Sequence, residues 1–205
     1  MTGKKLILQL ALATLIGMPL IAVLMDRFSD TIDLRTSLIG IFPWWKQIVI
    51  GVITGALFAF FAQMIIEAPF MRQVNVKYIA VLGGFRLTWN EIVFISLCAG
   101  VGEELLFRGA LQPIMGILWT SLFFVAIHGY INPRDWRISV YGIYMTVVIC
   151  VLGWFARSSG LVTAMIAHTL IDIWLLHKMQ VAADKEEHHH VFPGNDSTHT
   201  DEGNE

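Results

Sequence analysis

The sequence has few charged residues and few cysteines, and each shortage argues against a class of function. Only 15% of the 205 residues are charged, the formal net charge is −2 and no basic patch is present, so no nucleic-acid partner is expected. Cys98 and Cys150 both lie in apolar runs without CxxC or Cys/His spacing, which indicates buried structural thiols. HExxH and GxSxG motifs are absent, and there is no internal repeat.

Long apolar runs are abundant instead. Hydrophobic residues make up 56% of the chain and the mean hydropathy is +0.64. Repeated apolar runs of about 18 residues or more are typical of transmembrane helices. The predicted fold class is therefore all-α, a polytopic helical membrane protein with about six transmembrane helices: Leu6 to Met25, Gln47 to Ile66, a third from near Glu91, Ile117 to Ile131, Ile138 to Phe155 and Leu161 to Leu176.

Two segments differ from these spans. Residues 67–90 mix basic and apolar side chains between Pro69 and Gly83-Gly84, which predicts an interfacial helix between the second and third spans. Residues 178–205 are acidic and almost free of apolar residues, which predicts a disordered tail. The expected domains are an integral membrane domain, 1–177, with a motif-bearing core at 91–176, and the tail, 178–205.

The distribution of basic residues predicts the orientation, because cytoplasmic loops carry an excess of Lys and Arg. With six spans, the loops on the side of the two termini hold nine basic residues and the opposite loops hold four, so both termini are expected in the cytoplasm. The nine are Lys4, Lys5, Arg72, Lys77, Arg86, Arg134, Arg137, Lys178 and Lys185, and the four are Arg27, Arg35, Lys46 and Arg157.

The third span carries two adjacent acids and an arginine in a long apolar run, Gly100 to Gly109. Ionised groups within a bilayer are costly, so they usually pair or line a functional site. Glu104 and Arg108 are four residues apart, a spacing that favours an ion pair on one helix face. Glu103 points about 100° away from Glu104 and finds no cation on its own helix, so it is the candidate for chemistry.

Partners for Glu103 are expected on other spans. His128 ends the fourth apolar run, and His168 lies within the sixth span, four residues before Asp172 and therefore on the same helix face. If the third helix continues through Pro113 with a kink and breaks at Met115–Leu118, Glu103 lies 13 residues before Gly116 and His128 lies 12 after it. The two side chains then lie at nearly the same depth, given a rise of about 1.5 Å per residue.

A carboxylate and a histidine at one depth can activate water beside a carbonyl, while a second polar pair stabilises the oxyanion. Intramembrane Glu, His and Asp could instead form the proton relay of a proton-coupled transporter, although the chain shows neither a repeated half nor paired broken helices. Both interpretations remain open at this point.

Three motifs in order then resemble a known family. Glu103-Glu104-x-x-x-Arg108, Phe124-x-x-x-His128 and His168-x-x-x-Asp172 are similar to the motifs of the CAAX-protease and bacteriocin-processing (CPBP) intramembrane proteases, also called type II CAAX endopeptidases or Abi proteins. The resemblance covers about residues 91–176. It implies a peptidase of the bacterial cytoplasmic membrane whose partners are the lipid bilayer and a peptide or protein substrate that reaches the membrane.

The resemblance also implies roles for the motif residues. Glu103 and His128 would activate water, His168 and Asp172 would form the second polar pair, and Glu104 with Arg108 would support the site. The familiar CAAX enzymes have asparagine where this chain has Asp172, and a carboxylate donates no hydrogen bond unless it is protonated, so Asp172 would orient His168 instead.

Two mechanisms and one further function stay open under the resemblance. A metal-free glutamate mechanism and a zinc site are both compatible with the motifs, and zinc would need three convergent ligands, Glu103, His128 and His168. A non-catalytic immunity or scaffold protein with the same fold would share the motifs too.

Overall fold

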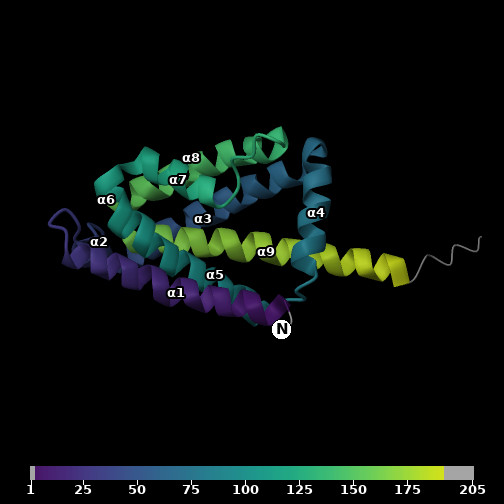
Figure 1. Ribbon diagram of the computed structural model, residues 1–205, viewed down its shortest axis with the longest axis horizontal. Coiled ribbons are helices and arrows are strands. Elements are labelled where there is room, and N and C mark those ends of the chain that lie inside the picture. Colours follow the sequence, from purple (N-terminus) through teal and green to yellow (C-terminus); the bar gives the residue numbers. More distant parts are fainter. Residues whose placement is uncertain (1–2, 192–205) are drawn as a thin grey trace, which may run out of the picture.

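The computed structural model describes residues 3–191, and every regular element in that range is a helix (Figure 1). The elements are α1 (Gly3–Arg27), α2 (Leu34–Ile39), α3 (Trp44–Glu67), η1 (Pro69–Met71), α4 (Arg72–Gly83), α5 (Trp89–Glu104), η2 (Leu105–Leu111), α6 (Gln112–Met115), α7 (Ile117–Ile127), α8 (Trp136–Ser158) and α9 (Leu161–Val191).

Four of the described helices are long and apolar enough to cross a membrane: Gly3–Arg27, Trp44–Glu67, Trp136–Ser158 and the segment Leu161–Lys185 of α9. Large apolar side chains cover their outer faces, including Ile16 on α1, Ile53 on α3 and Ile143 on α8, which are 60%, 64% and 68% exposed. Apolar surface on this scale is suited to lipid. The predicted class, a polytopic helical membrane protein, is confirmed.

Helix α5 continues without a gap through η2 and α6 and ends at Gly116, as the depth argument predicted. Gly116 has φ +77°, a left-handed conformation that suits glycine and ends the helix. A π-helical stretch, η2, begins directly after Glu104, ends two residues before Pro113 and closes with a bond from the Gln112 N–H to the Phe107 carbonyl. Such stretches widen a helix locally and often occur at functional sites. The kink expected at Pro113 stays a prediction.

The fourth predicted span, Ile117 to Ile131, is shorter than expected. Helix α7 ends at Ile127, so its 11 residues extend about 17 Å, roughly half of a hydrocarbon core about 30 Å thick. Gly129, with φ +75°, turns the chain out of the helix, and residues 129–135 lead to α8. The six predicted crossings therefore correspond to α1, α3, the α5–η2–α6 run, α7, α8 and α9, with α7 as a half-length element.

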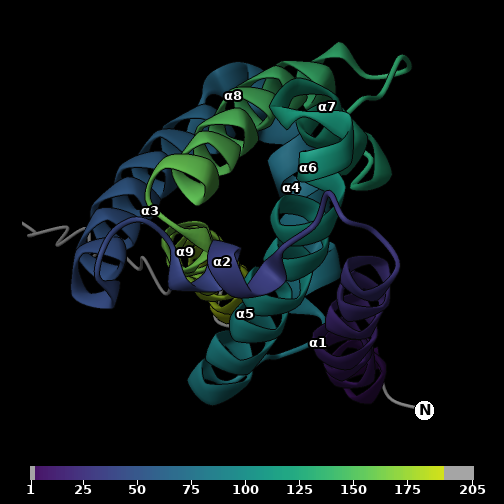
Figure 2. The same ribbon diagram turned by 90° about the vertical axis from the view of Figure 1, so that its left-hand side faces the viewer.

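Helix α9 is the central helix of the bundle, surrounded by α3, α5 and α8 in the view along its axis (Figure 2). Small residues let its neighbours come close. A Cβ on Gly55 of α3 would lie 2.7 Å from the Ala167 carbonyl oxygen, and one on Gly100 of α5 would overlap Thr169 Oγ1. Residues 163–169 of α9 are thereby held against both neighbouring helices.

The segment predicted to be interfacial forms helix α4, which crosses α9 (Figure 1). Gly83 packs against Ala183, and Gln180 Oε1 accepts a hydrogen bond of 3.0 Å from the Leu87 N–H. Because of this packing, α9 continues past residue 177, where the acidic tail was expected to begin, as far as Val191. Residues 192–205 of the predicted tail lie outside the described part of the chain.

Candidate active site

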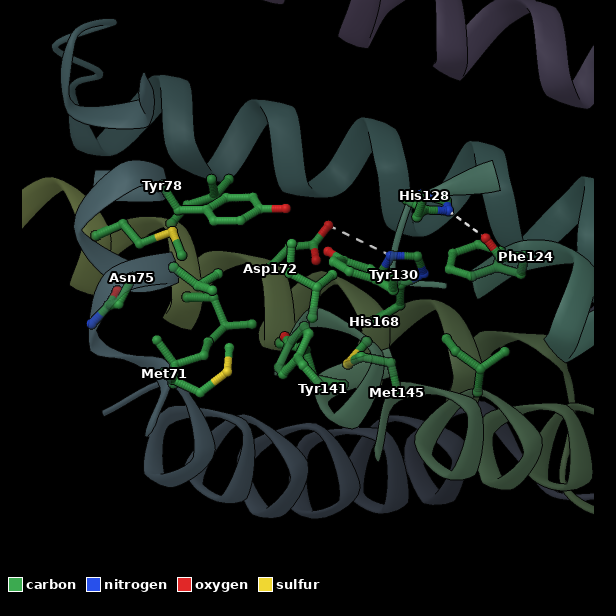
Figure 3. A pocket seen from close by; sticks show the side chains of 18 of the residues that line it. Met71, Asn75, Tyr78, Phe124, His128, Tyr130, Tyr141, Met145, His168 and Asp172 are labelled. Carbon is green, nitrogen blue, oxygen red and sulfur yellow. Dashed lines mark hydrogen bonds and ion pairs between the residues drawn. The ribbon is translucent and has the colours of Figure 1, made fainter. Parts of the chain in front are cut away.

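The predicted site residues come together from three helical regions. Figure 3 shows His128, His168 and Asp172 among them. Glu103 and Glu104 are the last two residues of α5, immediately before the π-helical stretch. His128 follows the last residue of the short helix α7, and His168 lies on the central helix α9. Residues 24 to 65 positions apart in sequence, on three different helical regions, therefore share one site.

Glu103 faces two imidazole rings. Its Oε2 lies 3.6 Å from His128 Nε2 and 3.9 Å from His168 Nε2, and this oxygen is buried without a hydrogen-bond partner. The predicted depth match between Glu103 and His128 is thus confirmed. Both distances exceed the 2.7–3.2 Å typical of a direct hydrogen bond, and gaps of this kind suit a bridging water.

His128 is oriented so that its Nε2 faces this gap. Its Nδ1 lies 2.7 Å from the Phe124 carbonyl oxygen, and because a carbonyl only accepts, Nδ1 carries the proton. In the neutral ring Nε2 then offers a lone pair toward Glu103. The ring also stacks on Phe124, with centroids 4.2 Å apart and planes 23° apart, which restricts its rotation.

His168 is held by the ion pair predicted from the third span. Glu104 Oε1 lies 2.9 Å from Arg108 Nη1, as the i, i+4 spacing indicated, and the same oxygen lies 2.7 Å from His168 Nδ1. Glu104 and Arg108 are almost fully buried. The link from Glu104 to His168 was missed in the sequence, since it joins residues 64 positions apart and no local spacing signals it.

Asp172 lies beside His168, as the four-residue spacing predicted. Glu104 already holds the Nδ1 edge of His168, so Asp172 is not the group that orients the ring through that atom. Asp172 Oδ2 instead lies 3.5 Å from His168 Nε2, on the edge that faces Glu103, and its side chain is 31% exposed. Asp172 therefore lies at the open side of the site, next to the cavity described below (Figure 3).

A cavity of about 400 Å³ extends from the acid and the two histidines toward α4. Apolar side chains such as Met71, Met145 and Ile149 form most of its wall, and Tyr78, Tyr130 and Tyr141 add hydroxyl groups (Figure 3). These tyrosines were not predicted as site residues from the sequence. Their signal in the sequence is weak, because Tyr78 lies in the mixed segment 67–90, Tyr130 and Tyr141 lie in predicted spans, and no motif includes them.

The described residues contain no group of three or more His, Cys, Asp or Glu side chains arranged to hold a metal ion. The three expected zinc ligands converge, with His128 Nε2 and His168 Nε2 both directed at Glu103, but their donor atoms do not form such a set. Both rings hold Nδ1 on another group and leave Nε2 directed at Glu103, an orientation that serves a bridging water molecule and a metal ion alike.

Part of the chain is similar to known proteins. Residues 85–174 match the family model described as "Type II CAAX prenyl endopeptidase Rce1-like", and this range includes all three motifs. The chain is 33% identical over 103 residues to the "Uncharacterized protein YpbD" of Bacillus subtilis (strain 168), an alignment that covers 48% of this chain and 52% of that protein. The chain thus spans about half the length of this relative. No solved structure matches the chain.

Proposed function

We propose, from the confirmed resemblance of residues 85–174 to the type II CAAX prenyl endopeptidases, that this membrane protein is an intramembrane endopeptidase in which Glu103 activates a water molecule. One observation carries the mechanism. The unpartnered Oε2 of Glu103 faces two imidazole nitrogens at distances suited to a bridging water, beside a cavity large enough for part of a peptide.

The proposed reaction begins with water between Glu103 and His128. Glu103 removes a proton from the water while the water oxygen attacks the carbonyl carbon of the scissile peptide bond. This step gives a tetrahedral oxyanion. The C–N bond then breaks, and Glu103 returns the proton to the leaving amine. His128, with Nε2 as an acceptor, orients the attacking water.

Glu104 and Arg108 act as positioning residues in this proposal. A carboxylate bonded to His168 Nδ1 holds the ring with Nε2 directed at the reacting atoms. Arg108 in turn neutralises Glu104 and lies over the Phe124 ring, 4.7 Å from its centroid, so it also connects α5–η2 to α7.

The substrate is proposed to be a peptide or protein segment that reaches the membrane. The cavity beside the site is mainly apolar, so it would accommodate hydrophobic side chains next to the scissile bond. The cavity leads from the site toward α4. Helix α4 lies at the same end of the bundle as the start of α1, where Gly3 lies near Phe85 (Figure 1). By the charge distribution this is the cytoplasmic end.

The test is cleavage of a library of quenched fluorescent peptides, with and without a prenyl group, by the purified protein in detergent. The Glu103→Gln and His128→Ala variants are compared with Glu67→Gln, an exposed acid at the end of α3. Removal of a general base typically costs about 10²–10⁴-fold in rate, so the first two variants should lose cleavage, whereas Glu67→Gln should retain it.

Two results would count against the proposal. Full cleavage by both the Glu103 and the His128 variants would refute the mechanism. Absence of Glu103-dependent cleavage across the library would favour a non-catalytic membrane protein, such as an immunity or scaffold protein or a proton-coupled transporter. Addition of a metal chelator should leave peptide cleavage intact. If the chelator abolishes cleavage and added zinc restores it, the metal-free form of the mechanism is refuted.

A further inference from the structure

Tyr130 is held beside the site by its backbone. It lies just after α7, where its N–H donates a hydrogen bond of 3.2 Å to the Val125 carbonyl. Its own carbonyl group packs directly on Gly142 of α8, where an added Cβ would overlap the carbonyl oxygen and lie 2.9 Å from the carbonyl carbon. Only a residue without a Cβ at position 142 allows the chain to pass so close to α8, so the position of Tyr130 is determined by both helices.

The ring of Tyr130 is held between two other aromatic side chains. It lies nearly parallel to His128, with an angle of 12° between planes and 6.1 Å between centroids. The edge contact with Tyr141 has a centroid distance of 5.2 Å and an angle of 77°. Aromatic contacts of these two types are favourable, and together they restrict the direction of the phenol.

The hydroxyl of Tyr130 is directed into the site. Tyr130 lines the same cavity as Glu103, His128 and His168, and in Figure 3 its hydroxyl end points toward Asp172. The hydroxyl of Tyr144, by contrast, donates a hydrogen bond of 2.6 Å to the Phe58 carbonyl of α3.

The proposed reaction needs a hydrogen-bond donor that the motif residues supply poorly. The tetrahedral intermediate carries an oxyanion, and preorganised donors provide much of its stabilisation. A carboxylate such as Asp172 only accepts hydrogen bonds, and the Nδ1–H groups of His128 and His168 are used on the Phe124 carbonyl and on Glu104. A phenol is a donor that stays protonated at neutral pH, since its usual pKa is about 10.

We propose that Tyr130 is a catalytic residue whose hydroxyl donates a hydrogen bond to the oxyanion formed at the scissile carbonyl. This inference rests on the proposed peptidase function. No proton is transferred from Tyr130. Its O–H bond stays intact while the charge builds up on the substrate oxygen and disappears when the C–N bond breaks.

The experiment compares kcat and KM of Tyr130→Phe, Tyr130→Leu, Tyr144→Phe and the wild type on a peptide that the wild type cleaves. Tyr130→Phe keeps the ring stacked on His128 and removes the hydroxyl alone, so kcat should fall about 10²-fold, with KM and the thermal unfolding midpoint nearly unchanged. Tyr144→Phe removes a hydroxyl that bonds to α3 and should retain the wild-type kcat.

The other outcomes overturn the inference in distinguishable ways. Wild-type kcat in Tyr130→Phe together with loss in Tyr130→Leu would show that the ring matters only by packing on His128. A change in KM alone in Tyr130→Phe would assign the hydroxyl to substrate binding. Either result, with cleavage still dependent on Glu103, refutes the role of Tyr130 and leaves the proposed function standing. Absence of any Glu103-dependent cleavage overturns both.

Discussion

Removal of Arg108 should destabilise the protein strongly because it leaves a buried carboxylate without its cation. Arg108 Nη1 lies 2.9 Å from Glu104 Oε1, and the side chains are 1% and 0% exposed. With an effective dielectric constant of about 20, the attraction between two charges at this distance is about 6 kcal/mol, part of which offsets the cost of burying them. Breaking a buried pair from one side typically costs about 3–5 kcal/mol, which is the loss expected for Arg108→Met.

The measurement is an unfolding titration in mixed micelles, followed by tryptophan fluorescence or circular dichroism. Lys4→Met is the matched control. Lys4 forms an ion pair with Glu91 at a similar distance, 2.8 Å, but the two side chains are 34% and 23% exposed. Exposed pairs are well screened and contribute little, so this variant should unfold close to the wild-type midpoint.

The double variant Glu104→Gln/Arg108→Met separates charge burial from packing. Removing both charges leaves no uncompensated ion, so the double variant should be more stable than Arg108→Met alone. The reasoning is refuted if Arg108→Met unfolds at the wild-type midpoint, or if the double variant loses as much stability as the two single variants added together.

Two further predictions concern packing and orientation. Gly100→Ala should force α5 away from Thr169 on α9 and cost about 1–3 kcal/mol of stability. Gly17→Ala should be nearly neutral, because a Cβ there meets nothing within 4 Å. Equal effects of the two substitutions on the unfolding midpoint would contradict this prediction. In intact cells, a cysteine that replaces Lys178 should resist an impermeant thiol reagent, whereas a cysteine that replaces Lys46 should react. The reason is that the distribution of basic residues predicts a cytoplasmic position for Lys178. The reverse labelling pattern would overturn the predicted orientation.

Several features of the fold could be predicted because they depend on neighbouring residues. Apolar runs about 20 residues long indicated the membrane helices, and the four-residue spacing of Glu104 and Arg108 indicated their ion pair. The break at Gly116 was predicted from the assumption that Glu103 and His128 lie at one depth in the membrane. A helix rises by a fixed distance per residue, so the number of residues from each side chain to the break gives its depth.

The length of α7 and the extent of α9 were harder to predict. An apolar run to Ile131 looks like a span, yet Gly129 ends the helical segment after Ile127. The chain after His177 is polar, yet Gln180 and Ala183 pack against residues 83–87 and α9 continues. In both places a turn or a tertiary contact overrides the average hydropathy of the segment.

The sequence by itself therefore determined the class of the protein, the position of its long apolar helices and the identity of the acids and histidines within them. Only the tertiary structure decided how those groups pair: that Glu104 bonds to His168, that Asp172 faces the cavity, and that Tyr130 stacks on His128. The physical reason is that hydropathy and helical spacing act along a single helix. Contacts between helices depend instead on close approach at residues such as Gly100 and Gly142, which no periodicity within one helix reveals.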